Sequence, residues 1–127
     1  MWEVDTIMGM ARTLAAVFGA VYIVAGIAGF VLETPLFGLF DVNVLHNVVH
    51  IAIGAILLYG ATTTPLAVMT TRGIGALLVV LGVLGIPIPD GFGLVPLGGN
   101  DIWLHLASGA ILLAAGLLGS SSETATA

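Results

Sequence analysis

The sequence predicts an all-α fold, a polytopic membrane four-helix bundle that repeats a two-helix hairpin in tandem. Three observations predict it. The chain of 127 residues is 59% hydrophobic and carries only seven acidic residues and two arginines. It contains four long apolar stretches. Its two halves also align with each other at a nearly constant offset, which predicts a pseudo-twofold axis along the membrane normal.

The low charge excludes several classes of protein. Only 7% of the residues are charged, whereas soluble domains carry about 25%. The net charge of −5 and the absence of lysine argue against a nucleic-acid partner, because binding nucleic acid needs basic surface. Without cysteine, neither a disulfide nor a thiolate metal site is possible. The acidic, lysine-free composition also suggests a salt-loving source.

The four apolar stretches each predict one membrane-spanning helix. A helix needs about 20 apolar residues to cross a bilayer, and a lone strand would leave its backbone unpaired in lipid. The expected helices cover residues 13–32, 44–61, 73–88 (extendable back to 66) and 102–119. They form one transmembrane domain, 1–127, with repeat A at about 12–61, repeat B at about 66–119 and a disordered polar tail at 120–127.

Polar residues and prolines mark the helix ends. Asn43 is expected to cap the second helix, and Asn100 and Asp101 the fourth, because their short side chains can accept from free helical N–H groups. The other breaks fall at 33–35, 62–65 and 87–91.

Two arginines predict the orientation in the membrane. Arg12 and Arg72 fall on one side, which the positive-inside rule makes cytoplasmic. Both termini are then cytoplasmic, and the bundle lies in the cell membrane. The acidic segment 1–5 and the long apolar run behind it do not suit a cleavable signal.

The internal repeat rests on identities at fixed spacing. At an offset of 55, ten of the 22 residues in 37–58 match those in 92–113. At an offset of 56, the glycines of the first helix fall on glycines of the third. Such glycine edges let helices approach closely in lipid, and we expect them to suit partner helices or a second copy of the chain.

The repeat pairs the polar residues of the second and fourth helices. His50 corresponds to His105, and His46 to Asp101. Within each helix the two members lie one turn apart on one face. The sequence therefore predicts a four-residue cluster at a single depth, on the outer side of the membrane.

Three interpretations of this cluster stay open. In the first, His46, His50, Asp101 and His105 bind a metal ion such as Zn²⁺ or Cu²⁺. In the second, His50 and His105 ligate a haem b iron from opposite sides. In the third, which the shallow position favours, the residues bind no cofactor and hydrogen-bond neighbouring polar groups to lock the hairpins together. Proton or solute handling is a further possibility.

Two motifs carry a resemblance to a known family. They are Gly38-Leu39-Phe40 leading to Asn43, His46, Asn47 and His50, and Trp103-Leu104-His105 leading to Gly109. The chain resembles small four-helix bacterial and archaeal membrane proteins catalogued as a domain of unknown function. The resemblance spans about 12–119 and implies the fold and a membrane location, but no activity.

We therefore expect a small integral membrane protein with a structural or interaction role, as a subunit of a complex or a homo-oligomer. The alternative is a metal- or haem-binding redox or transport protein. No nucleophile triad, paired carboxylates or phosphate loop appears, so the sequence does not predict an enzyme.

Overall fold

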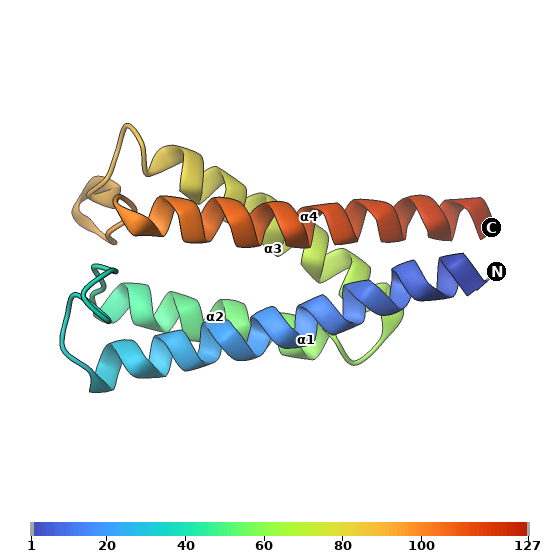
Figure 1. Ribbon diagram of the computed structural model, residues 1–127, viewed down its shortest axis with the longest axis horizontal. Helices are drawn as coiled ribbons and strands as arrows, with labels where there is room; N and C mark the ends of the chain where they lie inside the picture. Colours follow the sequence, from blue (N-terminus) through green and yellow to red (C-terminus); the bar gives the residue numbers. More distant parts are fainter. Residues whose placement is uncertain (1, 127) are drawn as a thin grey trace.

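The computed structural model describes the backbone of residues 2–126 and the side-chain surroundings of residues 9–119. The described chain is all-helical. It consists of α1 (Trp2–Val31), α2 (Val44–Gly60), α3 (Thr64–Leu84), the short 3-10 turn η1 (Gly91–Gly93) and α4 (Asn100–Thr126). The termini lie at one end of the bundle, and the segments 32–43 and 85–99 lie at the other, which we call the loop end (Figure 1).

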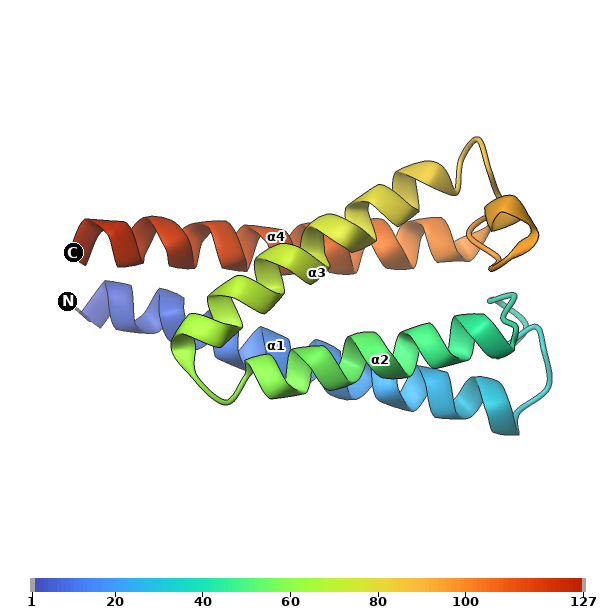
Figure 2. The same ribbon diagram turned by 180° about the vertical axis from the view of Figure 1, so that it is seen from behind.

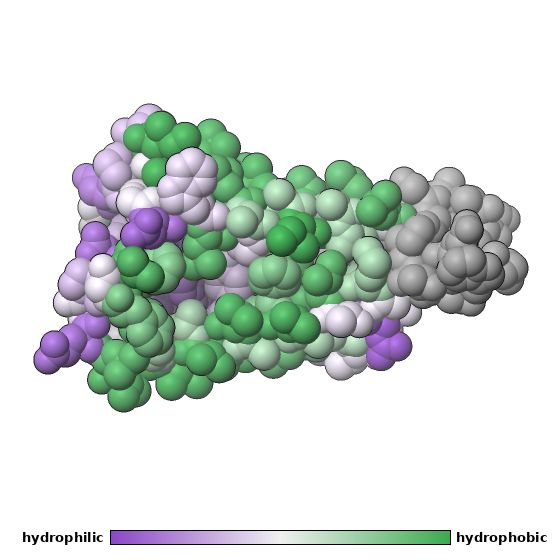
Figure 3. Space-filling model, in the orientation of Figure 1, coloured by the Kyte–Doolittle hydropathy of each residue, from purple (hydrophilic) through white to green (hydrophobic). Residues whose placement is uncertain are grey.

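Three helical segments are long and apolar enough to cross a membrane. They are Gly9–Val31, Thr64–Leu84 and Asn100–Gly119. The fourth, Val44–Gly60, has 17 residues, which is the lower limit of about 17–25 for a span. Apolar surface covers the middle of the bundle, and hydrophilic surface gathers at the loop end (Figure 3). An all-helical membrane protein is therefore the architecture that these lengths and this surface support.

The helices pack as two antiparallel hairpins. The α1–α2 and α3–α4 pairs have the most extensive contacts, and Figures 1 and 2 show each pair side by side, with α3 inclined to the other helices. Glycine permits the close approach within each hairpin. A Cβ added at Gly19 would lie 3.0 Å from the carbonyl oxygen of Gly54, and one added at Gly75 would lie 2.9 Å from that of Gly109. These glycines thus pack inside the hairpins.

The helix boundaries differ from the prediction in several places. Asn43 caps α2 as predicted, because its side chain accepts from the backbone N–H of His46 at 2.8 Å. The polar stretch 62–65, however, only separates α2 from α3, since Thr63 caps α3 and the helix begins at Thr64. In addition, α1 begins at Trp2, well before residue 13.

The predicted caps of α4 are wrong. Asn100 is the first residue of the helix, and its side-chain amide donates to the carbonyl of Leu39 in the other hairpin. Neither carboxylate oxygen of Asp101 has a hydrogen-bond partner among the described residues. The backbone of α4 continues to Thr126, through most of the segment expected to be disordered, and its side chains from 120 onward lie outside the described residues.

A small apolar core holds the hairpins together midway along the bundle. Tyr22, Leu57, Leu78 and Leu112 are at most 1% exposed. One buried hydrogen bond joins the hairpins here, between the Tyr22 hydroxyl and the Ser108 hydroxyl at 2.7 Å. Because the Ser108 hydroxyl also donates to the Leu104 carbonyl at 2.6 Å, Tyr22 is the donor in the bond between them.

Candidate metal site

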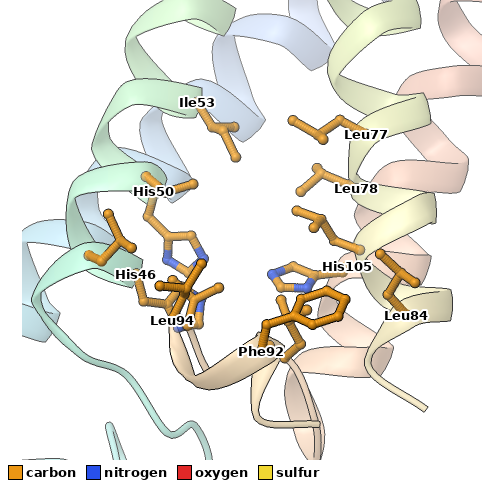
Figure 4. A pocket seen from close by; sticks show the side chains of 15 residues that line it. His46, His50, Ile53, Leu77, Leu78, Leu84, Phe92, Leu94 and His105 are labelled. Carbon is orange, nitrogen blue, oxygen red and sulfur yellow. The ribbon is translucent and has the colours of Figure 1, made fainter. Parts of the chain in front are cut away.

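The three histidines of the chain converge between the hairpins near the loop end. His46 and His50 lie one turn apart on α2, and His105 faces them from α4 (Figure 4). One ring nitrogen from each can be chosen so that all three lie within 4.8 Å of one another. Their residues are 2–4% exposed. The spacing of four residues on α2 and the pairing of the two hairpins thus bring together residues 59 positions apart in the sequence.

The imidazole rings are packed against one another. The ring centroids of His46 and His50 lie 4.2 Å apart, and that of His105 lies 6.1 Å from both. Tyr22 packs edge-on against His50, with ring centroids 5.2 Å apart. The Tyr22 ring, fixed by its bond to Ser108, therefore limits how the His50 ring can move.

The ring nitrogens are buried without protein partners. Both nitrogens of His46, both of His50 and Nδ1 of His105 have no hydrogen-bond partner among the described residues. Buried polar atoms are otherwise nearly always paired. Within the part of the chain that the structure describes, the interpretation that the histidines lock the hairpins together through hydrogen bonds to Asn43, Asn47 or Asp101 therefore finds no such bond.

Asp101 is not one of the residues whose ligand atoms converge. It is 1% exposed and lines a cavity of about 160 Å³ together with His50 and Leu104 of α4. The group whose ligand atoms converge comprises the three histidines only. Of the four residues that the sequence places in one cluster, three thus converge, and Asp101 lies beside His50 as a nearby buried carboxyl group.

A larger cavity opens on the other side of the histidines. It has a volume of about 330 Å³ and lies between α2, α3 and the segment that contains η1. His46 and His50 of α2 line one side of it, and His105 lies on the opposite side with Leu77, Leu78 and Leu84 of α3 (Figure 4). Phe92 and Leu94 close it at the loop end. The histidines are therefore reachable from an apolar space.

The candidate site lies within a known protein family. The family described as "Domain of unknown function (DUF4383)" matches residues 12–118. The chain belongs to this family. The matched range holds the three histidines, Asp101 and both cavities, so the whole candidate site lies inside the DUF4383 domain. No curated protein and no solved structure matches the chain.

The residues of this DUF4383 domain do not suit a haem. The distance of 6.1 Å between the His50 and His105 rings would admit an iron between them, since each iron–imidazole bond is about 2 Å long. His46 nevertheless lies as close to both rings, in the space that a porphyrin needs. The negatively charged propionates of a haem would also lie near acidic residues. Arg12 could not pair with them, because it donates to the carbonyls of Ala61 and Thr62, away from the loop end.

In this DUF4383 domain, Tyr22 contacts the candidate site and Trp103 lies outside it. Tyr22 contacts His50 and was not singled out by the sequence, where it is one aromatic residue in an apolar run. Trp103, which precedes His105 by two positions, is 70% exposed and lines neither cavity beside the histidines. Tyr22 lies on another helix and could be connected with His50 only through the packing of α1 on α2.

Proposed function

We propose that the protein is an integral membrane metal-binding protein, in which His46, His50 and His105 hold one Zn²⁺ or Cu²⁺ ion. The observation that carries this proposal is the convergence of three buried imidazoles, five of whose six ring nitrogens have no hydrogen-bond partner among the described residues. Three protein ligands and one open position are typical of catalytic zinc sites. Neutral imidazole also suits copper, whereas calcium and magnesium prefer oxygen.

The distances fit such an ion after a small adjustment. Zinc–imidazole bonds are about 2.0–2.1 Å long, so nitrogens bound to one ion lie within about 4.2 Å of each other. The present limit of 4.8 Å therefore requires inward ring movements of at most about 1 Å. Side-chain rotation of His46 and His105 supplies this without moving the helices.

Asp101 supplies compensating charge in this proposal. A dication bound by three neutral imidazoles leaves two positive charges in an apolar site, where charge is costly. The carboxyl group of Asp101 is buried beside His50 and is the nearest acidic group on α4. It stabilises the bound ion by its charge while the histidines provide the bonds.

The packing argues for a binding or redox role at one end of the bundle and against passage through it. Beyond the histidines the space between the helices is filled by the buried core of Leu57, Leu78 and Leu112. A transport path would need free polar groups or water there, whereas the Tyr22 and Ser108 hydroxyls in this core already bond each other. A structural role through exposed glycine edges also loses support, because Gly19, Gly54, Gly75 and Gly109 pack within the hairpins.

We further propose that the bundle has four crossings and a pseudo-twofold axis. Equivalent contacts support this: Gly26 packs on Ile51, and Gly82 packs on Leu106, at offsets of 56 and 55. The loops agree as well, since Phe37 and Phe92 share a positive φ of 56° and 62°. Cytoplasmic termini, which place the histidines on the outer side, and a homo-oligomeric state remain predictions from the sequence.

Metal uptake by tag-free protein tests the proposed function. The protein is purified in mild detergent, and a chelator removes any metal it carries. It is then dialysed against Zn²⁺ or Cu²⁺, and elemental analysis measures the bound metal. We expect one ion per chain and its loss in His50→Ala and His105→Ala. Thr71→Val is the control, because Thr71 is a buried polar residue that bonds only carbonyls of its own helix. Wild-type protein that retains no stoichiometric metal would refute the proposal.

A further inference from the structure

The cavity of about 330 Å³ beside the histidines lies at the lower end of the volumes of small-molecule sites, about 300–1,000 Å³. Its walls are almost wholly hydrocarbon. The polar side chains that line it are the three histidines, and no charged side chain does so. Such a surface selects a ligand with an apolar body and one polar head directed at the imidazoles.

The cavity reaches the surface of the bundle between α2 and α3. Four of its lining residues are strongly exposed, namely Leu45 at 45%, Leu77 at 43%, Phe92 at 72% and Leu94 at 62%. Leu45 and Leu77 belong to α2 and α3 and are exposed hydrophobic residues, so this opening lies on an apolar part of the surface, on the side of the bundle that faces the viewer in Figure 2. A molecule dissolved in the bilayer can enter here, whereas an ion in water meets hydrocarbon first.

We infer that this cavity binds an uncharged, lipid-soluble molecule with one compact nitrogen- or oxygen-donor head, and that the head occupies the open position of the histidine-bound metal. This inference rests on the proposed metal site and names the class of molecule that the site takes. A cationic head is excluded because the bound dication would repel it, and the apolar walls favour an uncharged molecule over an ionised one. Leu78 and Ile53 line the inner end, so the apolar body extends towards the opening between α2 and α3.

Two probes that share a donor but differ in apolar area test the inference. Co²⁺-loaded protein is titrated with imidazole and with 4-phenylimidazole, and binding is measured by the change in the visible absorption of Co²⁺. Both probes offer the same nitrogen, but only the second has a ring that the leucine walls can bury. Burial of a phenyl ring predicts binding at least about tenfold tighter.

Matched substitutions decide whether this preference arises in the cavity. Leu81→Trp fills the cavity from α3, and Val95→Trp fills it from the loop, should the first variant fail to fold. Val80→Trp is the control, because Val80 is 53% exposed and does not line the cavity. We expect either cavity variant to keep Co²⁺, to keep the affinity for imidazole, and to bind 4-phenylimidazole at least about tenfold more weakly than the control.

The outcomes separate the two proposals. A chain that binds Co²⁺ but does not prefer 4-phenylimidazole, or whose preference survives both filling substitutions, contradicts the ligand site and leaves the metal site intact. A folded chain that binds no Co²⁺ contradicts the metal site and the ligand site with it.

Discussion

Removal of the Ser108 hydroxyl should cost more stability than removal of the Tyr22 hydroxyl, although both groups belong to one hydrogen bond. Tyr22→Phe deletes the donor and leaves the Ser108 oxygen still donating to the Leu104 carbonyl. That loss is worth about 0.5–1.5 kcal/mol, and about 0.6 kcal/mol is the average between membrane helices. Ser108→Ala instead leaves a phenol that is 1% exposed without an acceptor, at a cost of about 1–3 kcal/mol.

Reversible unfolding of the protein in mixed micelles, with sodium dodecyl sulfate as denaturant, measures these free energies. The double variant should cost less than the sum of the two single variants, because either one already breaks the bond. Tyr59→Phe is the control, since Tyr59 is 66% exposed and should change stability little. If Tyr22→Phe proves as costly as Ser108→Ala, the donor and acceptor are assigned wrongly; if the two costs add, the two hydroxyls do not bond each other.

Four further outcomes are expected. Gly75→Ala should destabilise the bundle by about 1–3 kcal/mol, because the added Cβ would meet the backbone of α4. Gly73→Ala is the control, since Gly73 borders open space on the same helix and its substitution should not destabilise the bundle. Equal unfolding free energies for the two variants would contradict this prediction. Asn43→Asp should keep the cap of α2 but lose the bond to the Leu94 carbonyl, so thermal unfolding should rank it between wild type and Asn43→Ala. Asp101→Asn should weaken Zn²⁺ binding about tenfold without abolishing it, and an unchanged dissociation constant would remove its proposed role. Zn²⁺ affinity should fall in acid, because protons and the metal compete for the same imidazole nitrogens; calorimetry at neutral and at acidic pH measures the difference, and equal affinities would contradict imidazole ligands.

Much of the fold could be predicted from the sequence, because in lipid an apolar run has little choice but to form a helix. The cap at Asn43 could be predicted as well, since it depends only on residues three positions apart. The cap at Asp101 could not, because tertiary packing turned the carboxyl group inward beside His50. A cap predicted from neighbouring residues alone fails where packing against another helix gives the side chain a different position.

The candidate site was only partly predictable for the same reason. The positions of His46 and His50 on one face of α2 follow from helical periodicity, and their proximity to His105 follows from pairing the hairpins. The direction in which the glycine edges face does not follow, because an edge such as that of Gly19 suits a neighbour in the same chain as well as a partner. The cavity between α2 and α3 also depends on the inclination of α3 (Figure 2), which no sequence pattern specifies.

X-ray absorption at the zinc edge of the loaded protein measures the ligands of the proposed site directly. Three imidazole ligands at about 2.0–2.1 Å are expected in wild-type protein, whereas His105→Ala should show no zinc bound in such a shell. Because the chain contains three histidines in all, a shell of three imidazoles requires His46, His50 and His105 together. A shell made only of oxygen ligands, or one that His105→Ala leaves unchanged, would contradict the metal site.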